Sequence, residues 1–249
     1  MKTINYKGKF LLIGILFIAG CASTPMKKLT PVELITEKKS KYETLPSAEG
    51  LTGWEKGLWL YKHHQYKKAI PLLEPHKNEG IAEVEHAYGY MNEHFKKDYK
   101  KAIEWYKKAI KHGNLPNSLN NLANYYDNGV VVAKDESKAT DLFIQSAKQG
   151  YNIAQFNLAN RYCSGNGASE DHGKAYYWFQ QAYHNGNSFA AERIGHMYEL
   201  PGHSFKVNYQ KSLEWYTLSA QMGNKKGQEG VIRIKYRLNR NQPKGIIIQ

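Results

Sequence analysis

The chain has 249 residues, 41% of them hydrophobic, with 19 Tyr and 5 Trp. This apolar content is enough for a packed core and excludes a globally disordered chain. Thirty-five basic against 22 acidic residues give a net charge of +13, which attracts acidic proteins, anionic lipids, anionic glycans or nucleic acid. Charge alone does not choose among these partners.

The first twenty residues have the composition of an export signal. A segment with three lysines and no acid precedes the apolar run Phe10–Ala19, which is too short to span a membrane but typical of a secretory signal. The run leads into Ile18-Ala19-Gly20-Cys21, which resembles a bacterial lipobox. The resemblance implies cleavage before Cys21 and attachment of fatty acyl chains such as palmitate to it. An ordinary signal peptide with a chance cysteine is the alternative.

The residue after the cysteine bears on localisation. Ala22 stands there instead of Asp, which in lipoproteins of enterobacterial type implies sorting to the outer membrane. We therefore expect a lipid anchor on Cys21 in the outer membrane, facing the periplasm, since several acyl chains attach a protein stably. Removing residues 1–20 takes away Lys2, Lys7 and Lys9 and lowers the net charge to +10. The polar, proline-containing residues 21–48 are expected to form a flexible tether.

Cysteine usage excludes a disulfide framework. The chain has 2 cysteines, and if Cys21 carries lipid, Cys163 has no intramolecular partner. We expect Cys163 to be a small buried residue at a helix end.

A pattern of small, aromatic and glycine residues recurs five times after residue 48. Each segment has a small residue, followed three and four places later by aromatic or Leu residues, a spacing typical of an amphipathic helix. A glycine stands eleven places after the small residue. The glycines are Gly80, Gly113, Gly150, Gly186 and Gly223. Each is expected just beyond its helix, with a positive φ that closes the last turn.

Another helix is predicted after each glycine, with small residues four and nine places after it, as at Ala154 and Ala159. Because one helix pair cannot bury its own apolar face, repeats of this length predict a solenoid. We expect an all-α protein, a right-handed α-solenoid of about five antiparallel helix pairs over residues 49–224, followed by a basic capping helix and tail over 225–249. Pro71 and Pro75 predict an N-terminal cap with a shortened or kinked second helix.

The segments Lys101–Ala109 and Ala154–Tyr162 resemble the Sel-one-like repeat, a relative of the tetratricopeptide repeat, and the likeness extends over roughly residues 50–224. The resemblance implies a curved solenoid that recruits proteins. The paired cysteines of the disulfide-rich branch are absent, so the penicillin-binding or hydrolytic activity proposed for that branch has no support here.

The polar residues favour structural roles over catalysis. The ten histidines lack metal-ligand spacing and are expected to be solvated. Asp135 and Asp171 precede repeat helices and are expected to cap them. We expect no catalytic residue, metal, cofactor, nucleic acid or small-molecule substrate.

Positions seven and ten after each glycine are expected on the concave side of such a solenoid. Asn amides there could bond an extended peptide while arginines select acidic groups; the alternative is that these Asn bond within the solenoid. The candidate partner-binding residues are Tyr90, Asn121, Asn124, Asn157, Asn160, Arg193, His196 and Arg233.

These features together predict a non-enzymatic scaffold or adaptor lipoprotein on the periplasmic side of the envelope, with an acidic protein or peptide as partner. A narrower alternative is an immunity lipoprotein that neutralises a secreted effector such as a type VI lipase. An alternative from another class is an envelope hydrolase or cell-wall-binding protein.

Overall fold

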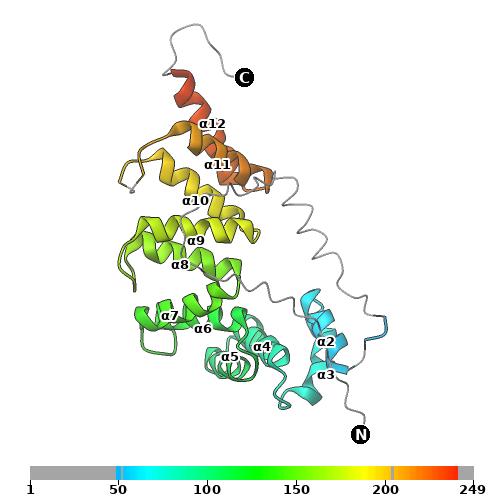
Figure 1. Ribbon diagram of the computed structural model, residues 1–249. Helices are drawn as coiled ribbons and strands as arrows, with labels where there is room; N and C mark the ends of the chain where they lie inside the picture. The colour runs from blue at the N-terminus through cyan, green and yellow to red at the C-terminus, as the bar shows by residue number, and fades with distance from the viewer. Residues whose placement is uncertain (1–48, 52, 203–204, 241–249) are drawn as a thin grey trace, which may run out of the picture.

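The computed structural model describes residues 49–51, 53–202 and 205–240, which form helices and no strand (Figure 1). The export signal, Cys21 and the tether lie outside these residues, as do residues 241–249 of the tail. The elements are α2 (Gly53–Lys62), α3 (Tyr66–Leu73), η1 (Glu74–His76), α4 (Ala82–Met91), η2 (Asn92–Lys96), α5 (Tyr99–Gly113), α6 (Pro116–Asn128), α7 (Glu136–Lys148), α8 (Asn152–Ser164), α9 (His172–His184), α10 (Ser188–Glu199), α11 (Tyr209–Gln221) and α12 (Lys225–Arg240).

Neighbouring helices pack in pairs, and the pairs stack one after another along the chain (Figure 1). The pairs are α2 with α3, α4 with α5, α6 with α7, α8 with α9, and α10 with α11, and α12 closes the stack against α11 and α10. We call the earlier member of each pair the first helix and the later member the second helix. The predicted right-handed α-solenoid of five helix pairs is confirmed.

Each second helix from α5 onward begins at the same side-chain cap. The residue before the helix accepts a hydrogen bond from the backbone N–H three positions later, which satisfies one of the unpaired donors of the first turn. The caps are Asp98, Asp135, Asp171 and Asn208, at 3.1, 2.9, 2.8 and 2.9 Å. The predicted caps Asp135 and Asp171 are therefore confirmed.

The donor of each capping bond belongs to a lysine, a residue whose charge is unfavourable near a helix N-terminus. Three of these lysines place their ammonium groups over tyrosine rings of the preceding first helix, which offsets the repulsion. Lys138 lies 4.3 Å from the ring of Tyr126, and Lys211 lies 5.3 Å from that of Tyr198. Each contact also joins the start of the second helix to the first helix and so restrains the loop between them.

Four of the five repeat glycines adopt the predicted left-handed conformation, with φ of 73°, 83°, 93° and 85° at Gly80, Gly150, Gly186 and Gly223. The prediction is wrong for Gly113, which is the last residue of α5; Asn114 takes the left-handed position with φ of 47°. Asparagine tolerates that conformation better than most side chains. Gly113 is needed for a close approach instead, because a Cβ there would lie 2.5 Å from the Cβ of Ala82.

Each second helix from α5 onward places one aromatic ring in the core. Tyr106, Phe143, Phe179 and Tyr216 are at most 1% exposed. Small residues of the first helices make room for them. A Cβ on Gly89 would lie 2.5 Å from the Tyr106 ring, so this glycine cannot carry a side chain without repacking.

The N-terminal pair departs from the repeat as predicted. α3 has only eight residues, contains Pro71, and gives way to the 3-10 turn η1 around Pro75. The next first helix, α4, runs into the π-helical turn η2, which ends where Lys97 adopts a φ of 55°. These two irregular segments make the N-terminal end differ in shape from the rest of the stack.

The basic helix α12 is held by a buried ion-pair cluster around Glu199, which is 3% exposed. Arg233 donates from Nε and from Nη2 to its carboxylate, both at 2.7 Å, and Arg237 lies 3.2 Å away. Tyr216 donates to the same group at 2.7 Å. Burial opposes ionisation of Glu199, but the bonds from Arg233 and Tyr216 outweigh it and hold the pKa of this carboxyl below its usual range.

Among the described residues, a histidine of α4 differs from the solvated role predicted for all ten. His86 on α4 is 8% exposed, and its Nδ1 forms a hydrogen bond of 2.8 Å with the Ser118 hydroxyl of α6. Burial lowers the pKa of His86 to about 4, because the interior disfavours the imidazolium.

We expect Arg233→Ala to lower the free energy of unfolding by about 2 kcal/mol, because it leaves the buried Glu199 carboxylate with weaker compensation. The loss falls short of that for a fully buried pair because Arg237 remains. Urea denaturation followed by circular dichroism measures it. The exposed Arg240→Ala is the matched control and changes stability by no more than about 0.5 kcal/mol. Equal stability of both variants contradicts this role of Arg233.

We expect stability to fall between pH 6.5 and pH 4 because of His86. A histidine with a lowered folded pKa favours folding in its neutral form, so its contribution is complete above the unfolded pKa of about 6.5 and is lost as the pH falls through the folded value. The contribution is on the order of 3 kcal/mol. Urea denaturation across this range should show a smaller pH dependence for His86→Gln than for the wild type. The exposed His94→Gln serves as control, and an unchanged slope in His86→Gln contradicts the assignment.

Candidate protein-binding surface

The first helices form the inner side of the stack. The first helices α2 and α4 contact each other, as do α6 and α8, and α10 contacts the closing helix α12, whereas no two consecutive second helices come comparably close within the described residues. In a curved stack the inner edges converge, so the exposed side of the first helices is the concave one. The candidate partner-binding residues from Tyr90 to His196 lie on first helices, and Arg233 lies on the closing helix α12.

A polar pocket of about 190 Å³ lies at the centre of this side, between α6 and α8. The candidates Asn124, Asn157 and Asn160 line it together with Asp127 and Arg161. The pocket thus combines amides from two consecutive repeats. Residues one repeat apart in the sequence meet here because the stacking of the pairs places equivalent helix positions side by side.

Arg161 forms the wall of this pocket and is 5% exposed. It pairs with the Asp127 carboxylate of the preceding first helix and donates to the Asn166 carbonyl at 2.8 Å and the Thr140 hydroxyl at 3.1 Å. Its guanidinium is therefore engaged within the protein, as a buried charge requires.

The sequence reasoning missed Asp127 and Arg161, although a signal was present. An acid followed 34 residues later by arginine occurs at Asp127 and Arg161 and again at Glu199 and Arg233, and both pairs are in contact. Between these two pairs, Cys163 and Met197 stand at the corresponding positions and belong to an apolar cluster. An apolar pair thus stands between two charged pairs on the inner side.

Two of the candidate asparagines bond within the solenoid. Asn157 donates to Oδ1 of the buried Asn120 at 3.1 Å, and Asn120 donates to Oδ1 of Asn121 at 3.4 Å. This matches the alternative in which the amides at position seven serve the solenoid itself. Asn124 and Asn160 differ, because neither side chain has a hydrogen-bond partner among the described residues, and both are half-buried.

The remaining candidates lie toward the two ends. Tyr90 stacks on His94 at 3.9 Å between ring centroids and lines a second pocket of about 390 Å³ at the N-terminal end. Arg193 is exposed on α10, where its closest acid, Glu192, is 3.8 Å away, and His196 is half-buried on the same helix. Arg233 is held by Glu199. The surface is therefore aromatic at one end, amide-rich at the centre and basic at the other.

Three observations in the described part of the chain bear on metal binding, nucleophilic chemistry and membrane insertion. No three His, Cys, Asp or Glu side chains there gather into a possible metal site. Burial raises the pKa of the Cys163 thiol to about 11, which keeps it protonated and weakly nucleophilic. Among the same residues, no helix combines the length and apolar character needed to cross a membrane.

An α-solenoid with a pocketed inner side defines a class of binding scaffold. The Sel1 repeat family model matches residues 81–114, 116–151, 152–187 and 188–224, more than half of the chain. The protein belongs to the Sel1 repeat family, whose repeats mediate protein–protein interaction. The first helix pair, included in the predicted extent of the likeness, lies outside the matched segments.

Solved structures are similar in fold. A Sel1 repeat protein from Oxalobacter formigenes has 22% identity and a TM-score of 0.64, over 74% of this chain and 76% of that one. A protective antigen of uropathogenic Escherichia coli has 24% identity and a TM-score of 0.59, over 85% of this chain and 50% of that one. A putative Sel1 repeat protein from Klebsiella pneumoniae has 23% identity and a TM-score of 0.51, over 73% and 90%. A comparison with curated proteins finds no match.

Proposed function

We propose that this protein is a non-enzymatic scaffold that holds an extended segment of a partner protein along the inner side of the solenoid. The observation that carries the proposal is the pair of amides on Asn124 and Asn160, which line the central pocket without hydrogen-bond partners among the described residues. A partly buried amide gains from finding a partner. Each of the two offers a donor and an acceptor, the groups that a peptide backbone needs.

Charge supports an acidic partner. The chain carries +13, the pocket's own acid Asp127 is neutralised by Arg161, and the exposed Arg193 lies on α10, the next first helix beyond the pocket. Such a surface accelerates association with acidic proteins and disfavours basic ones.

We place the scaffold on the periplasmic side of the outer membrane, anchored by lipid on Cys21. The lysine-bearing start, the short apolar run and Ile18-Ala19-Gly20-Cys21 support this. A narrower form of the proposal is an immunity lipoprotein against a secreted effector, which export, a lipid anchor and an inner binding surface would all suit. An exported toxin encoded beside this gene would favour that form over a general adaptor.

We expect the double variant Asn124→Ala, Asn160→Ala to capture the partner about tenfold more weakly, because each lost hydrogen bond contributes about 0.5 to 1.5 kcal/mol. The mature, lipid-free protein serves as bait on an envelope extract, and captured proteins are quantified by mass spectrometry. Asn78→Ala with Asn239→Ala, two exposed sites outside the pocket, is the matched control. Equal capture by both double variants, or capture of peptidoglycan alone, contradicts the proposal.

We expect growth with a radioactive fatty acid to label the wild-type protein and not Cys21→Ser, because acylation requires that thiol. Gel autoradiography of the purified proteins reads out the label, and fractionation of the envelope locates it. An unlabelled wild type, or a labelled Cys21→Ser, would overturn the anchor.

A further inference from the structure

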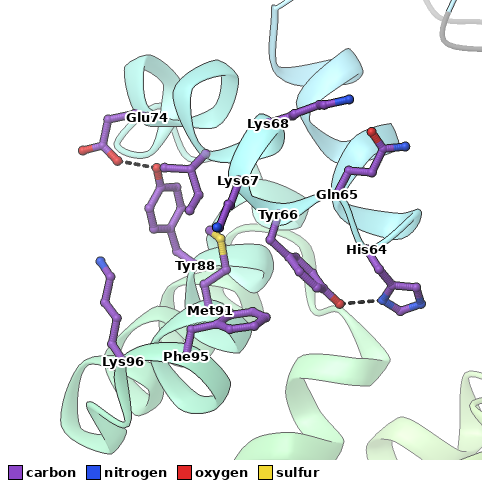
Figure 2. A pocket seen from close by; sticks show the side chains of 11 residues that line it. His64, Gln65, Tyr66, Lys67, Lys68, Glu74, Tyr88, Met91, Phe95 and Lys96 are labelled. Carbon is purple, nitrogen blue, oxygen red and sulfur yellow. Dashed lines mark hydrogen bonds between the residues drawn. The ribbon is translucent and has the colours of Figure 1, made fainter.

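A larger pocket of about 650 Å³ lies at the N-terminal end, between α3 and the α4–η2 segment (Figure 2). Its walls are mostly apolar and aromatic: Tyr66 and Ile70 from α3 face Tyr88, Met91 and Phe95 from α4 and η2. This pocket, which we call the cap pocket, contains none of the residues of the central pocket. Its size suits a bulky side chain or two.

Tyr88 and Met91 are buried, whereas the apolar residues at the mouth of the pocket are exposed and lie on the two irregular segments. The short helix α3 carries Ile70, and the π-helical turn of η2 carries Phe95. Phe95 is 56% exposed and Ile70 is 40% exposed, on opposite sides of the pocket. The terminal units of solenoids have a polar outer face for solubility, so exposed apolar residues at this end need a separate explanation.

The rim of the cap pocket is positively charged. Lys67, Lys68 and Lys96 line it, and none of the three forms an ion pair within the described residues. The lining contains one acid, Glu74, and its carboxylate already has partners within the protein. It accepts a hydrogen bond of 2.5 Å from the Tyr88 hydroxyl and forms an ion pair with Lys77. An occupant with negative charge beside an apolar group therefore complements the pocket.

The cap pocket continues into the inner side of the solenoid. His64 and Tyr66 line both this pocket and the neighbouring one of about 390 Å³ that contains Tyr90. The Tyr66 ring lies 4.7 Å from Phe95 and 6.1 Å from Tyr90, so aromatic rings bridge the two spaces. A chain lying along the inner side would reach the cap pocket without leaving the protein surface.

We propose that the cap pocket is a second docking subsite, which receives a large apolar side chain from an acidic polypeptide segment. The inference extends the proposed function and rests on it only in taking the partner to be a protein. The exposed mouth favours a polypeptide, because its backbone can cover Ile70 and Phe95 while one side chain enters, whereas an enclosed acyl chain would leave both exposed. A second copy of this chain is disfavoured because its net charge, +10 once residues 1–20 are removed, repels a positive rim.

A random dodecapeptide library displayed on phage tests the proposal, with the mature chain carrying Cys21→Ser as target. We expect selected peptides to combine Trp, Phe or Leu with neighbouring Asp or Glu. The affinity of the best synthetic peptide, measured by fluorescence anisotropy, should fall about tenfold in Ile70→Ser with Phe95→Ser, and by a similar factor in Lys67→Glu with Lys96→Glu. All four sites are exposed, so these variants should keep the wild-type circular dichroism spectrum.

Matched controls exist for both pairs. Ile153 and Phe189, which are 45% and 54% exposed outside the cap pocket, match Ile70 and Phe95 in chemistry and exposure. Lys107 and Lys111 are exposed lysines on α5 that do not line it. Ile153→Ser with Phe189→Ser, and Lys107→Glu with Lys111→Glu, should leave the peptide affinity within about twofold of the wild type.

Several outcomes overturn the inference. Selected peptides without acidic and apolar residues do so, as does an affinity that the cap-pocket variants leave unchanged. Binding to anionic phosphatidylglycerol vesicles that is lost in Ile70→Ser with Phe95→Ser would make the occupant a membrane surface. A dimer in light scattering that this variant dissociates would make it a second copy.

The two binding proposals fail separately. If Asn124→Ala with Asn160→Ala weakens capture of the partner while the cap-pocket variants do not, the central site stands and the second subsite falls. If only the cap-pocket variants weaken both capture and peptide binding, the second subsite stands and the central site falls.

Discussion

Each second helix from α5 onward places one aromatic ring in the space between itself and the neighbouring first helices. These rings belong to Tyr106, Phe143, Phe179 and Tyr216. Each ring is completely buried only because the facing positions are small, such as Gly89 opposite Tyr106. The packing of each ring against small residues determines how closely successive helix pairs approach each other. The alignment of equivalent side chains on the inner side, and hence each pocket there, follows from that spacing.

The sequence specifies the solenoid because its units repeat their packing rules. Small, aromatic and glycine positions recur at fixed offsets, and a helix period of 3.6 converts them directly into a buried stripe. The exception at Gly113 is instructive. A glycine can close a helix or allow a close approach, and sequence alone does not distinguish these uses; the contact with Ala82 decides it, and Asn114 supplies the turn.

The candidate binding surface was less predictable than the fold, for physical reasons. Helix offsets place a residue on a face but do not say whether a neighbouring repeat already satisfies it, as Asn120 does for Asn157 and Glu199 does for Arg233. The cap pocket escaped prediction entirely. It depends on the π-helical turn after α4, which shifts Phe95 out of the register that a regular helix period assumes.

The ion pair between Asp127 and Arg161, which come from consecutive repeats, limits how the array can change in length. Loss of residues 152–187, a single repeat, would bring Asp127 opposite Met197 and leave a carboxylate facing a thioether. Loss of both 152–187 and 188–224 would place Ile234 at the position of Arg161, so the carboxylate would face an aliphatic side chain. Loss of one central repeat or of two therefore removes the partner of Asp127, and either change is expected to leave an unpaired carboxylate on the inner side.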